Sequence, residues 1–497
     1  MSEMTGLFSP REAWDELSAE RGWYVRKHRA AYSGVHEELR ATAVSGSFWA
    51  RAGKAKVHVP IASDIASASA DLLFGNPPRC RVYNDLTDEV EDGKQDPLDA
   101  ILRESGFEGL LQEAAETAAV TGDVYLKCNW DAGALPCPTV AFVGGDDAVP
   151  EYRFGQLQCV HFFTDVKRER KTQKVWRLYE RYERGRILSG IFCGDAADLG
   201  EEVPGALEAF GIDAETLVPG GGMMAVHIPN AKPSRVRKAE YGRSDFEGMR
   251  DMLDSLDEVY SSWMRDIRLA KSRLIVPAEF LRRKPNFGSE GESRYTFEFD
   301  EDVETLVALD ISNDTEMKIT PSQFAIRAEE HAKTAEALVR NIISMSGYSP
   351  QTFGLDIQGQ ASSGTALLIR EKKSFSMRSK KLNYWSMPLE RFLTAVMRLD
   401  AEVYGEISAQ EGDRVIIEFP DSMSTDLSTI SQAVQLMHNA QAASTETMVK
   451  MLHPDWEQGQ IEDEVRKVME EYGVATMEPD AMQGDLHGVP AGGEDEA

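Results

Sequence analysis

Hydrophobic residues recur every three or four positions in the first quarter of the chain, a spacing typical of helices with one buried face. Such a pattern covers residues 61–74, and Gly75 followed by Asn76-Pro77-Pro78 predicts its end. An earlier helix should begin at Ser9-Pro10-Arg11-Glu12, which combines a cap hydroxyl, a proline at the first helical position and a glutamate three residues after the cap. A further helix is predicted over 97–120.

The hydrophobic period then changes to two. Hydrophobic and polar positions alternate along 124–130, which predicts a half-buried strand. Similar short runs are 139–143, 157–164, 174–181 and 186–193, separated by glycine-rich or charged turns. This succession predicts an antiparallel meander, so that residues 1–240 form an α+β region.

Two long helical patterns follow, with a short strand-containing insert between them. The first covers 244–274 and opens with the capping box Ser244-Asp245-Phe246-Glu247; the second covers 321–346 and opens at Thr320-Pro321-Ser322-Gln323. Acidic residues crowd the first half of the first helix and basic residues its second half, an order that favours the helix dipole. The predicted arrangement is two antiparallel helices joined by a small β insert, with strands near 294–298 and 305–309.

The C-terminal third is predicted to be mostly helical. A helix over 365–404 contains Pro388 as an expected kink site, a strand follows near 414–419, and helices are predicted at 427–451 and 456–472. Residues 476–497 contain acidic residues, glycine and proline but no Lys or Arg, so a disordered tail is expected.

Composition limits the function classes. The 497 residues include 54 Lys and Arg against 83 Asp and Glu, a formal charge of −29, while 42% hydrophobic residues indicate globular material. This net negative charge argues against a protein that binds duplex DNA tightly on its own. It does not argue against a protein through which DNA passes without being bound tightly. No apolar run is long enough for a membrane helix, and the N-terminus does not look like a secretory signal.

The usual chemical motifs are missing, so neither catalytic residues nor a cofactor are predicted. The loop 359–365 lacks the lysine of a phosphate-binding loop, and the stretch 36–39 lacks the second histidine of a metalloprotease helix. The acidic groups at 146–147 and 251–258 could hold Mg²⁺, but a solvated acidic face is the favoured interpretation. The five cysteines form no CxxC pair and are interpreted as reduced and buried, and no metal site is expected. His161 and His227 are interpreted as ordinary fold residues.

One basic cluster interrupts this acidic chain at the start of the long helix. Six cations lie within twelve residues beside the lone Glu371: Arg370, Lys372, Lys373, Arg378, Lys380 and Lys381. Two interpretations carry equal weight. The cluster is either a basic collar that meets nucleic-acid phosphate, or it pairs with an acidic neighbouring helix or subunit.

Several short sequence motifs, in their order and spacing along the chain, resemble those of the portal proteins of tailed bacteriophages. They are Val59-Pro60-Ile61-Ala62, Leu73-Phe74-Gly75-Asn76-Pro77, Val149-Pro150-Glu151, Tyr241-Gly242-Arg243-Ser244-Asp245, Ile275-Val276-Pro277, the run 346–354 (SGYSPQTFG) and the run 362–367 (SSGTAL) that continues to Arg370-Glu371. The resemblance covers roughly residues 55–405.

The resemblance implies an α+β, predominantly helical, portal-like fold in a homo-oligomeric ring, usually a dodecamer. It assigns the regions as follows: 1–240 wing, 241–274 first stem helix, 275–320 a small α/β clip, 321–347 second stem helix, 348–364 tunnel loop region, 365–405 long wing helix, 406–475 helical crown and 476–497 acidic tail.

The function implied by the resemblance is a channel for double-stranded DNA packaging and ejection at one capsid vertex of the virion, assembled in the host cytoplasm, with no catalysis, cofactor, metal or membrane. The implied tunnel loop is Gln358, Gly359, Gln360, Ala361, Ser362, Ser363 and Gly364. Terminase, and later head–tail adaptor proteins, would dock at the clip, where Arg282, Arg283 and Lys284 either meet acidic partner surfaces or are solvated turn charges. Major capsid and scaffolding proteins are further implied partners.

Three other functions remain open. A different head-morphogenesis or adaptor protein would leave the helix–insert–helix unexplained. A metal-dependent nuclease would have to cleave DNA as a purified protein, and an acidic cytosolic scaffold would be a monomer or dimer without an axial hole.

Overall fold

The computed structural model describes residues 8–51, 56–270, 273–275, 282–287, 293–298, 320–322, 326–355, 364–406, 409–410, 412–420, 427–440, 442–453, 456 and 458–471. The chain divides into two compact units. One comprises Met1–Gln360 with Ile369–Pro420, and the other comprises Ala361–Leu368 with Asp421–Ala497.

The first unit begins with helices whose buried residues belong to four separate hydrophobic clusters. They are α1 (Pro10–Glu20), a π-helical turn (Arg21–Val25), α2 (Arg26–Ser33), α3 (His36–Thr42), α4 (Ile61–Phe74), α5 (Gln95–Glu104) and α6 (Phe107–Thr121). The predicted capping box at Ser9 is confirmed, with Ser9 and Glu12 each bonding the other's backbone N–H. The predicted end of α4 is also confirmed, since Phe74 is its last residue.

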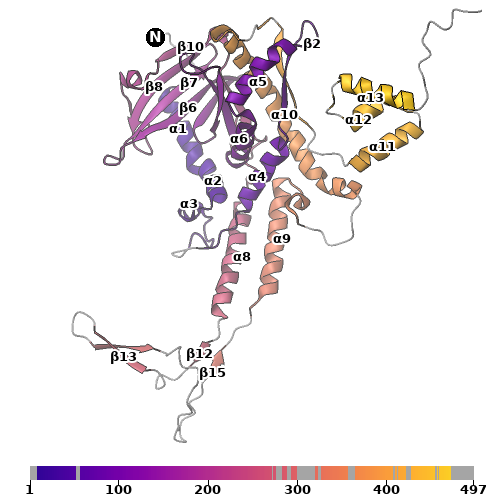
Figure 1. The fold of residues 1–497 in the computed structure, drawn as a ribbon. Coiled ribbons are helices and arrows are strands. Elements are labelled where there is room, and N and C mark those ends of the chain that lie inside the picture. The colour runs from indigo at the N-terminus through magenta and orange to yellow at the C-terminus, as the bar shows by residue number, and fades with distance from the viewer. Residues whose placement is uncertain are drawn as a thin grey trace, which may run out of the picture. The chain divides into compact units, whose positions relative to one another are not determined.

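An antiparallel meander forms the largest described sheet (Figure 1). The runs predicted at 157–164, 174–181 and 186–193 lie in it, whereas those at 124–130 and 139–143 form strands of a separate sheet, so one meander through all five runs is wrong. The strands of the largest sheet run in the order β10-β8-β7-β6-β5, with β9 paired to β8. The bounds are β5 (Ala148–Arg153), β6 (Gln156–Arg168), β7 (Val175–Glu183), β8 (Arg186–Gly194), β9 (Glu201–Glu202) and β10 (Glu215–Leu217), with the short α7 (Ala206–Phe210) between the last two.

Two smaller sheets complete this part. The first has the order β11-β3-β4 and the second the order β16-β1-β2. Their strands are β1 (Arg79–Asn84), β2 (Glu89–Val90), β3 (Asp123–Asn129), β4 (Thr139–Gly144), β11 (Ala225–Pro229) and β16 (Asp413–Glu418). Short 3₁₀ turns lie at Asp92–Lys94, Pro219–Gly221 and Pro350–Phe353. The second sheet joins residues more than 300 positions apart, because β1 pairs with β16.

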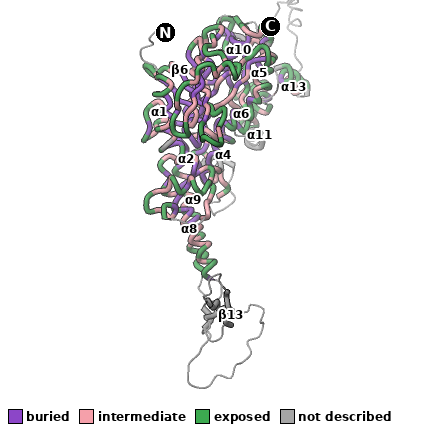
Figure 2. The backbone as a smooth tube through the Cα atoms, turned by 90° about the vertical axis from the view of Figure 1, so that its left-hand side faces the viewer, coloured by how far each residue is buried: buried purple, intermediate pink, exposed green. Residues whose placement is uncertain are grey.

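Helices α8 (Arg250–Leu269) and α9 (Ala328–Ser346) lie side by side (Figure 1). The first turns of α8 are buried and its last residues are exposed (Figure 2). The predicted start of this helix at Ser244 is wrong. The Ser244 hydroxyl donates to the carbonyl of Ala119 at 2.9 Å instead of capping the helix, and α8 begins six residues later without a side-chain cap.

The predicted cap at 320–323 is also wrong, because Thr320–Ser322 is a strand. This strand, β15, pairs with β12 (Arg273–Ile275), so its backbone groups bond across a ladder and α9 starts only at Ala328. The predicted strand near 294–298 is confirmed as β14 (Ser293–Glu298), which pairs with β13 (Arg282–Phe287). The strand predicted at 305–309 lies outside the described residues.

The long helix is confirmed as α10 (Gly364–Val403), with Pro388 inside it. Its Trp385, Leu389 and Phe392 side chains are buried in the core that α4, α6, β3 and β16 also line. Among the described residues, no helix is both long and apolar enough to cross a membrane.

The second unit consists of α11 (Leu427–Asn439), α12 (Thr445–Leu452) and α13 (Gln458–Glu471). The single helix predicted over 427–451 is therefore two. Ser444 separates them, because its hydroxyl accepts a hydrogen bond from the Thr447 backbone N–H at 3.2 Å and caps α12. The predicted tail at 476–497 lies outside the described residues.

A buried ionic cluster joins α1, β3 and the segment that precedes α8. Asp123 is fully buried, and its two oxygens contact His227 Nε2 at 2.7 Å and Arg237 Nη1 at 2.6 Å. Arg237 Nε also reaches Glu20 at 2.7 Å. Burial by itself raises the pKa of Asp123, but the attraction of Arg237 and the contacts of His227 outweigh it, and the net shift is downward.

Replacing Arg237 by glutamine should lower the free energy of unfolding by about 3–5 kcal/mol, because Asp123 would keep a buried, uncompensated charge. A group whose pKa is lowered by folding contributes stability that is lost as pH falls, so acid destabilisation should be shallower in the variant. Denaturant unfolding at several pH values measures both effects. Lys171→Gln, at an exposed turn, should stay within about 0.5 kcal/mol of wild type. An equally small effect of Arg237→Gln would contradict this account.

Candidate channel and docking regions

The basic cluster at the start of α10 divides into buried and exposed members. Lys381 is only 1% exposed and Arg378 only 8%, whereas Lys372, Lys373 and Lys380 are exposed. The side chain of Arg370 lies outside the described part of the chain. The helix therefore presents fewer cations to its surroundings than the sequence pattern suggests.

Lys381 is bound inside the protein. Its ammonium contacts Asp245 Oδ2 and Ser69 Oγ, both at 2.6 Å, and the Tyr348 hydroxyl donates to the same Asp245 oxygen at 2.8 Å. Burial lowers the pKa of Lys381, and the attraction of Asp245 opposes this shift. One ion pair thus ties α10 to α4, to the segment before α8 and to the segment after α9.

Arg378 is bound to backbone carbonyls. Its Nε donates to Leu72 at 2.7 Å and its Nη2 to Pro420 at 2.6 Å, so the guanidinium joins the end of α4 to the end of the β16 segment. The interpretation of six phosphate-contacting cations is therefore corrected for Arg378 and Lys381. Their charge stabilises the fold, and the partner of Lys381 is one buried aspartate in the segment before α8, not an acidic neighbouring helix or subunit.

The exposed lysines share one region of α10. Lys373 and Lys380 are seven residues apart, which places them on the same face of the helix, and Lys372 lies beside Lys373. Lys373 also donates to the backbone carbonyl of Ser344 near the end of α9. We call Lys372, Lys373 and Lys380 the exposed lysine group.

The acidic face predicted at 251–258 is only partly solvated. Asp254 and Asp257 are 4% and 2% exposed. Asp257 accepts hydrogen bonds from the Trp49 indole at 3.1 Å and the Val59 backbone N–H at 2.8 Å, and contacts His58 Nδ1 at 2.8 Å. These donors bind the carboxylate in place of water, so the interpretation of a solvated face is corrected for both residues.

The other acidic pair considered for Mg²⁺ is held by arginines. Asp146 contacts Arg29 Nε at 2.7 Å, and Asp147 forms an ion pair with Arg21. Protein cations thus already compensate these carboxylates, which is the opposite of what a Mg²⁺ site requires.

The far ends of α8 and α9 are joined by an aromatic and ionic contact. The Trp263 and His331 rings stack with centroids 6.0 Å apart and planes 9° from parallel. Asp266 contacts His331 Nε2 at 3.0 Å and Arg327 Nη2 at 3.1 Å. Nearer the body, Leu253 and Leu256 pack against Ile342 and Ile343 of α9 in one hydrophobic cluster.

The remaining predicted site residues lie in or beside segments outside the described residues. Arg282, Arg283 and Lys284 are the first residues of β13, in register with Glu298, Phe297 and Thr296 of β14. Of the predicted tunnel loop, Gln358–Ser363 falls outside the described residues and Gly364 begins α10.

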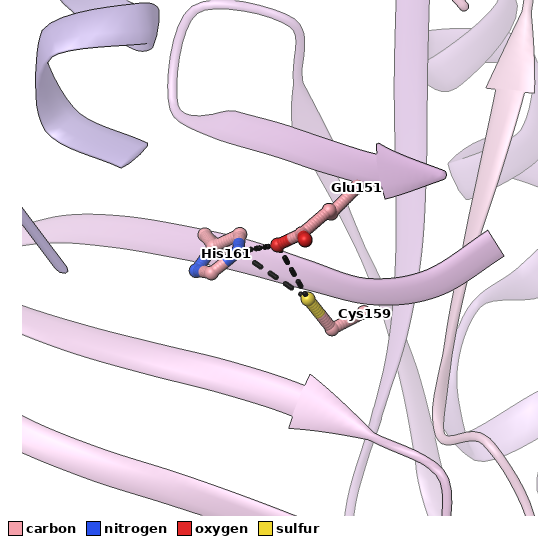
Figure 3. Close-up of side chains that lie close together, drawn as sticks. All are labelled: Glu151, Cys159 and His161. Carbon is pink, nitrogen blue, oxygen red and sulfur yellow. Dashed lines mark hydrogen bonds and ion pairs between the residues drawn. The ribbon is translucent and has the colours of Figure 1, made fainter. Parts of the chain in front are cut away.

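A polar cluster that the sequence interpretation missed lies in the meander. Glu151, Cys159 and His161 are buried, and their side chains converge on one point between β5 and β6 (Figure 3). The available signal was the Cys-x-His spacing on a predicted strand, which puts both side chains on one face.

The Lys381–Asp245 pair supports a matched test on neighbouring residues. Lys381→Met should lower the free energy of unfolding by about 3–5 kcal/mol, because it leaves Asp245 buried without its cation. Lys380→Met, one residue earlier and exposed, should change it by less than about 0.5 kcal/mol. Chemical denaturation of both variants gives the comparison, and equal effects would show that the buried pair is not a structural anchor.

The chain was compared with family models, curated proteins and solved structures. A family model described as phage portal protein, SPP1 Gp6-like, matches residues 50–471. Among solved structures, the chain is similar at 12% identity to a chain of the virion of native gene transfer agent (GTA) particle, covering 84% of this chain and 98% of that chain with a TM-score of 0.40. It is also similar at 12% identity to a chain from the neck of the empty GTA particle computed with C6 symmetry. That match covers 79% of this chain and 90% of the other chain, with a TM-score of 0.43.

A chain from the neck of the native GTA particle computed with C12 symmetry shares 14% identity with this chain. That match covers 79% of this chain and 89% of the other chain, with a TM-score of 0.40. No curated protein matches the chain. The family model spans most of the sequence, including the paired helices α8 and α9, the long helix α10 and the Lys381–Asp245 pair. The chain therefore belongs to the phage portal protein family of the SPP1 Gp6-like type.

Proposed function

We propose that the chain assembles into a closed ring at the unique vertex of a virion capsid, where it forms the channel for packaging and ejection of double-stranded DNA. The observation that carries this proposal is the family match over residues 50–471. The ring is a dodecamer, as the resemblance of the sequence motifs implies. Its subunits assemble in the host cytoplasm together with major capsid and scaffolding proteins.

The regional assignment follows the described elements. Helices α8 and α9 form the stem, the segments β12–β15 belong to the clip, and the helices and meander before α8 form the wing. Helix α10 is the long wing helix, the loop before it is the tunnel loop, and α11, α12 and α13 belong to the crown. The stacked Trp263–His331 pair and the Asp266 contacts keep α8 and α9 together where they approach the clip.

The charge of the chain suits a channel that conducts DNA. Every phosphate that a protein neutralises releases counterions and adds affinity, so a strongly basic wall would hold the duplex instead of letting it slide. A subunit charge of −29 gives a net repulsion of the DNA backbone. The exposed lysine group is a local exception and supplies a weak, salt-screened hold on DNA.

The proposed role requires no chemistry from this chain. Family membership supports an assembly component, and the acidic groups weighed as a Mg²⁺ site are bound by arginines and backbone donors. Energy for packaging would come from a terminase that docks at the clip, where Arg282, Arg283 and Lys284 lie on β13, and head–tail adaptor proteins would later take the same end.

Ring assembly is the first test. Negative-stain microscopy and native mass spectrometry of the purified protein should show a closed ring of twelve subunits with an axial hole wide enough for a B-form duplex. If the free chain is monomeric, co-expression with its capsid and scaffolding proteins should yield the ring. A chain that stays monomeric or dimeric in both settings, or that cleaves DNA with a divalent cation, would contradict the proposal.

The exposed lysine group can be tested separately. Replacing Lys372, Lys373 and Lys380 by glutamine together should reduce the DNA retained in filled particles while ring formation is unchanged. The deficit should be largest at low ionic strength and shrink as ionic strength rises, because salt screens the same contacts in the wild type. The charge-matched control replaces Arg170, Lys171 and Lys174, which are exposed on the turn between β6 and β7. Nuclease-protected DNA per particle is the measurement. Equal retention in both triple variants would exclude the DNA hold.

A further inference from the structure

Strands β5 and β6 bring three potential metal ligands together. Cys159 and His161 are two residues apart on β6, so their side chains share one face, and Glu151 lies opposite Cys159 in the strand register. Cys159 and His161 are completely buried and Glu151 is 8% exposed. Figure 3 shows the carboxylate, the thiol and the imidazole pointing toward one another.

The distances between these atoms match a shared tetrahedral ion. Cys159 Sγ lies 3.3 Å from His161 Nε2 and 3.6 Å from Glu151 Oε2, and His161 Nε2 lies 3.4 Å from the same oxygen. Zinc bonds of about 2.3 Å to sulfur and about 2.0 Å to nitrogen or oxygen, at tetrahedral angles, place ligand atoms about 3.3–3.6 Å apart. All three edges of the triangle agree with that geometry.

Hydrogen bonding alone explains the triangle less well. A charged imidazole–carboxylate hydrogen bond is normally about 2.7–2.9 Å long, whereas the His161–Glu151 contact is 3.4 Å. If His161 Nδ1 donates its proton to the Tyr179 hydroxyl, 2.9 Å away, the lone pair on Nε2 faces the carboxylate. Two electron-rich atoms that face each other in a buried site call for a cation between them.

We propose that Glu151, Cys159 and His161 bind a structural Zn²⁺ ion. A thiolate, an imidazole and a carboxylate are the side chains that this borderline-soft ion accepts, and a thiolate disfavours Mg²⁺ and Ca²⁺. The thiolate and carboxylate together balance the two positive charges. A fourth ligand would complete the tetrahedron.

The surroundings of the triangle fit such a site. Zinc binding would displace the thiol proton of Cys159 to solvent. The Tyr179 contact to His161 Nδ1 orients the imidazole, in the manner of the outer partners of metal-bound histidines. The neighbouring Arg181 is paired with Glu183 at 2.5 Å, which compensates its positive charge.

The position of the triangle indicates what the ion would do. The Phe8 backbone N–H donates to Glu151 Oε2 at 2.9 Å, immediately before α1 begins. Trp14 and Leu17 of α1 pack against Phe163 and Tyr179 of the meander in a separate hydrophobic cluster. A zinc ion at Glu151 would therefore fasten the start of α1 to the edge of the meander.

Metal analysis of the full-length protein tests the site directly. Protein purified without chelator from zinc-supplemented medium should contain one zinc per chain by inductively coupled plasma mass spectrometry. Cys159→Ser and His161→Gln should lower that content at least about tenfold. Cys128→Ser, which changes a buried cysteine on β3 outside the triangle, should leave it unchanged.

Two further measurements keep the proposal testable if the ligand variants do not fold. Chelator-treated wild type titrated with Co²⁺ should develop a thiolate-to-cobalt charge-transfer band and tetrahedral d–d bands. Tyr179→Phe should bind zinc about tenfold more weakly in a competition assay with a chromophoric chelator. A folded wild type that takes up no zinc and gives no such bands would overturn the site and leave a hydrogen-bonded polar triangle, whether or not the chain forms a ring.

Discussion

The buried ion pair between Lys381 and Asp245 is the constraint on which the arrangement of this protein depends. Asp245 lies five residues before α8, Tyr348 lies two residues after α9, and Lys381 is in the middle of α10. Through one carboxylate, the paired helices and the long helix are therefore fixed to each other and to α4. Replacing such a pair by apolar side chains can be neutral for stability, so we interpret it as a device that sets geometry.

A second set of buried charges joins N-terminal segments of the chain to α8 and to the segment that precedes it. Asp257 in α8 holds the Trp49 indole and the backbone of Val59, and Arg237 bridges Asp123 to Glu20. Several of the 83 acidic residues thus form internal contacts. In the proposed channel, the net negative charge of the chain would also limit its affinity for the duplex.

Much of the fold could be predicted from the sequence because its signals are local. The capping box at Ser9, the glycine and prolines after α4, the alternation along the meander and the length of α10 each depend on neighbouring residues. Two of the predictions that proved wrong depended on partners distant in the chain. Ser244 resembles a helix cap but bonds Ala119, and Thr320–Ser322 resembles a helix start but pairs with β12.

In the candidate sites, too, local features could be predicted from the sequence, whereas contacts between distant residues could not. The excess of cations at the start of α10 is visible in the sequence, but only the fold shows that Lys381 and Arg378 are bound within the protein and that Lys372, Lys373 and Lys380 are exposed. Cys159 and His161 are two residues apart and could be paired by strand alternation. Glu151 could be added only from the register of β5 against β6, which composition and spacing do not specify.

The most direct test of the account is a cryo-electron microscopy structure of the assembled particle neck at side-chain resolution. The account predicts a closed ring of this chain in which α8 and α9 of every subunit lie along an axial channel wide enough for duplex DNA. It also predicts the Lys381–Asp245 pair buried at each stem–wing junction. A ring with α8 and α9 away from the channel, or a neck without this chain, would contradict it.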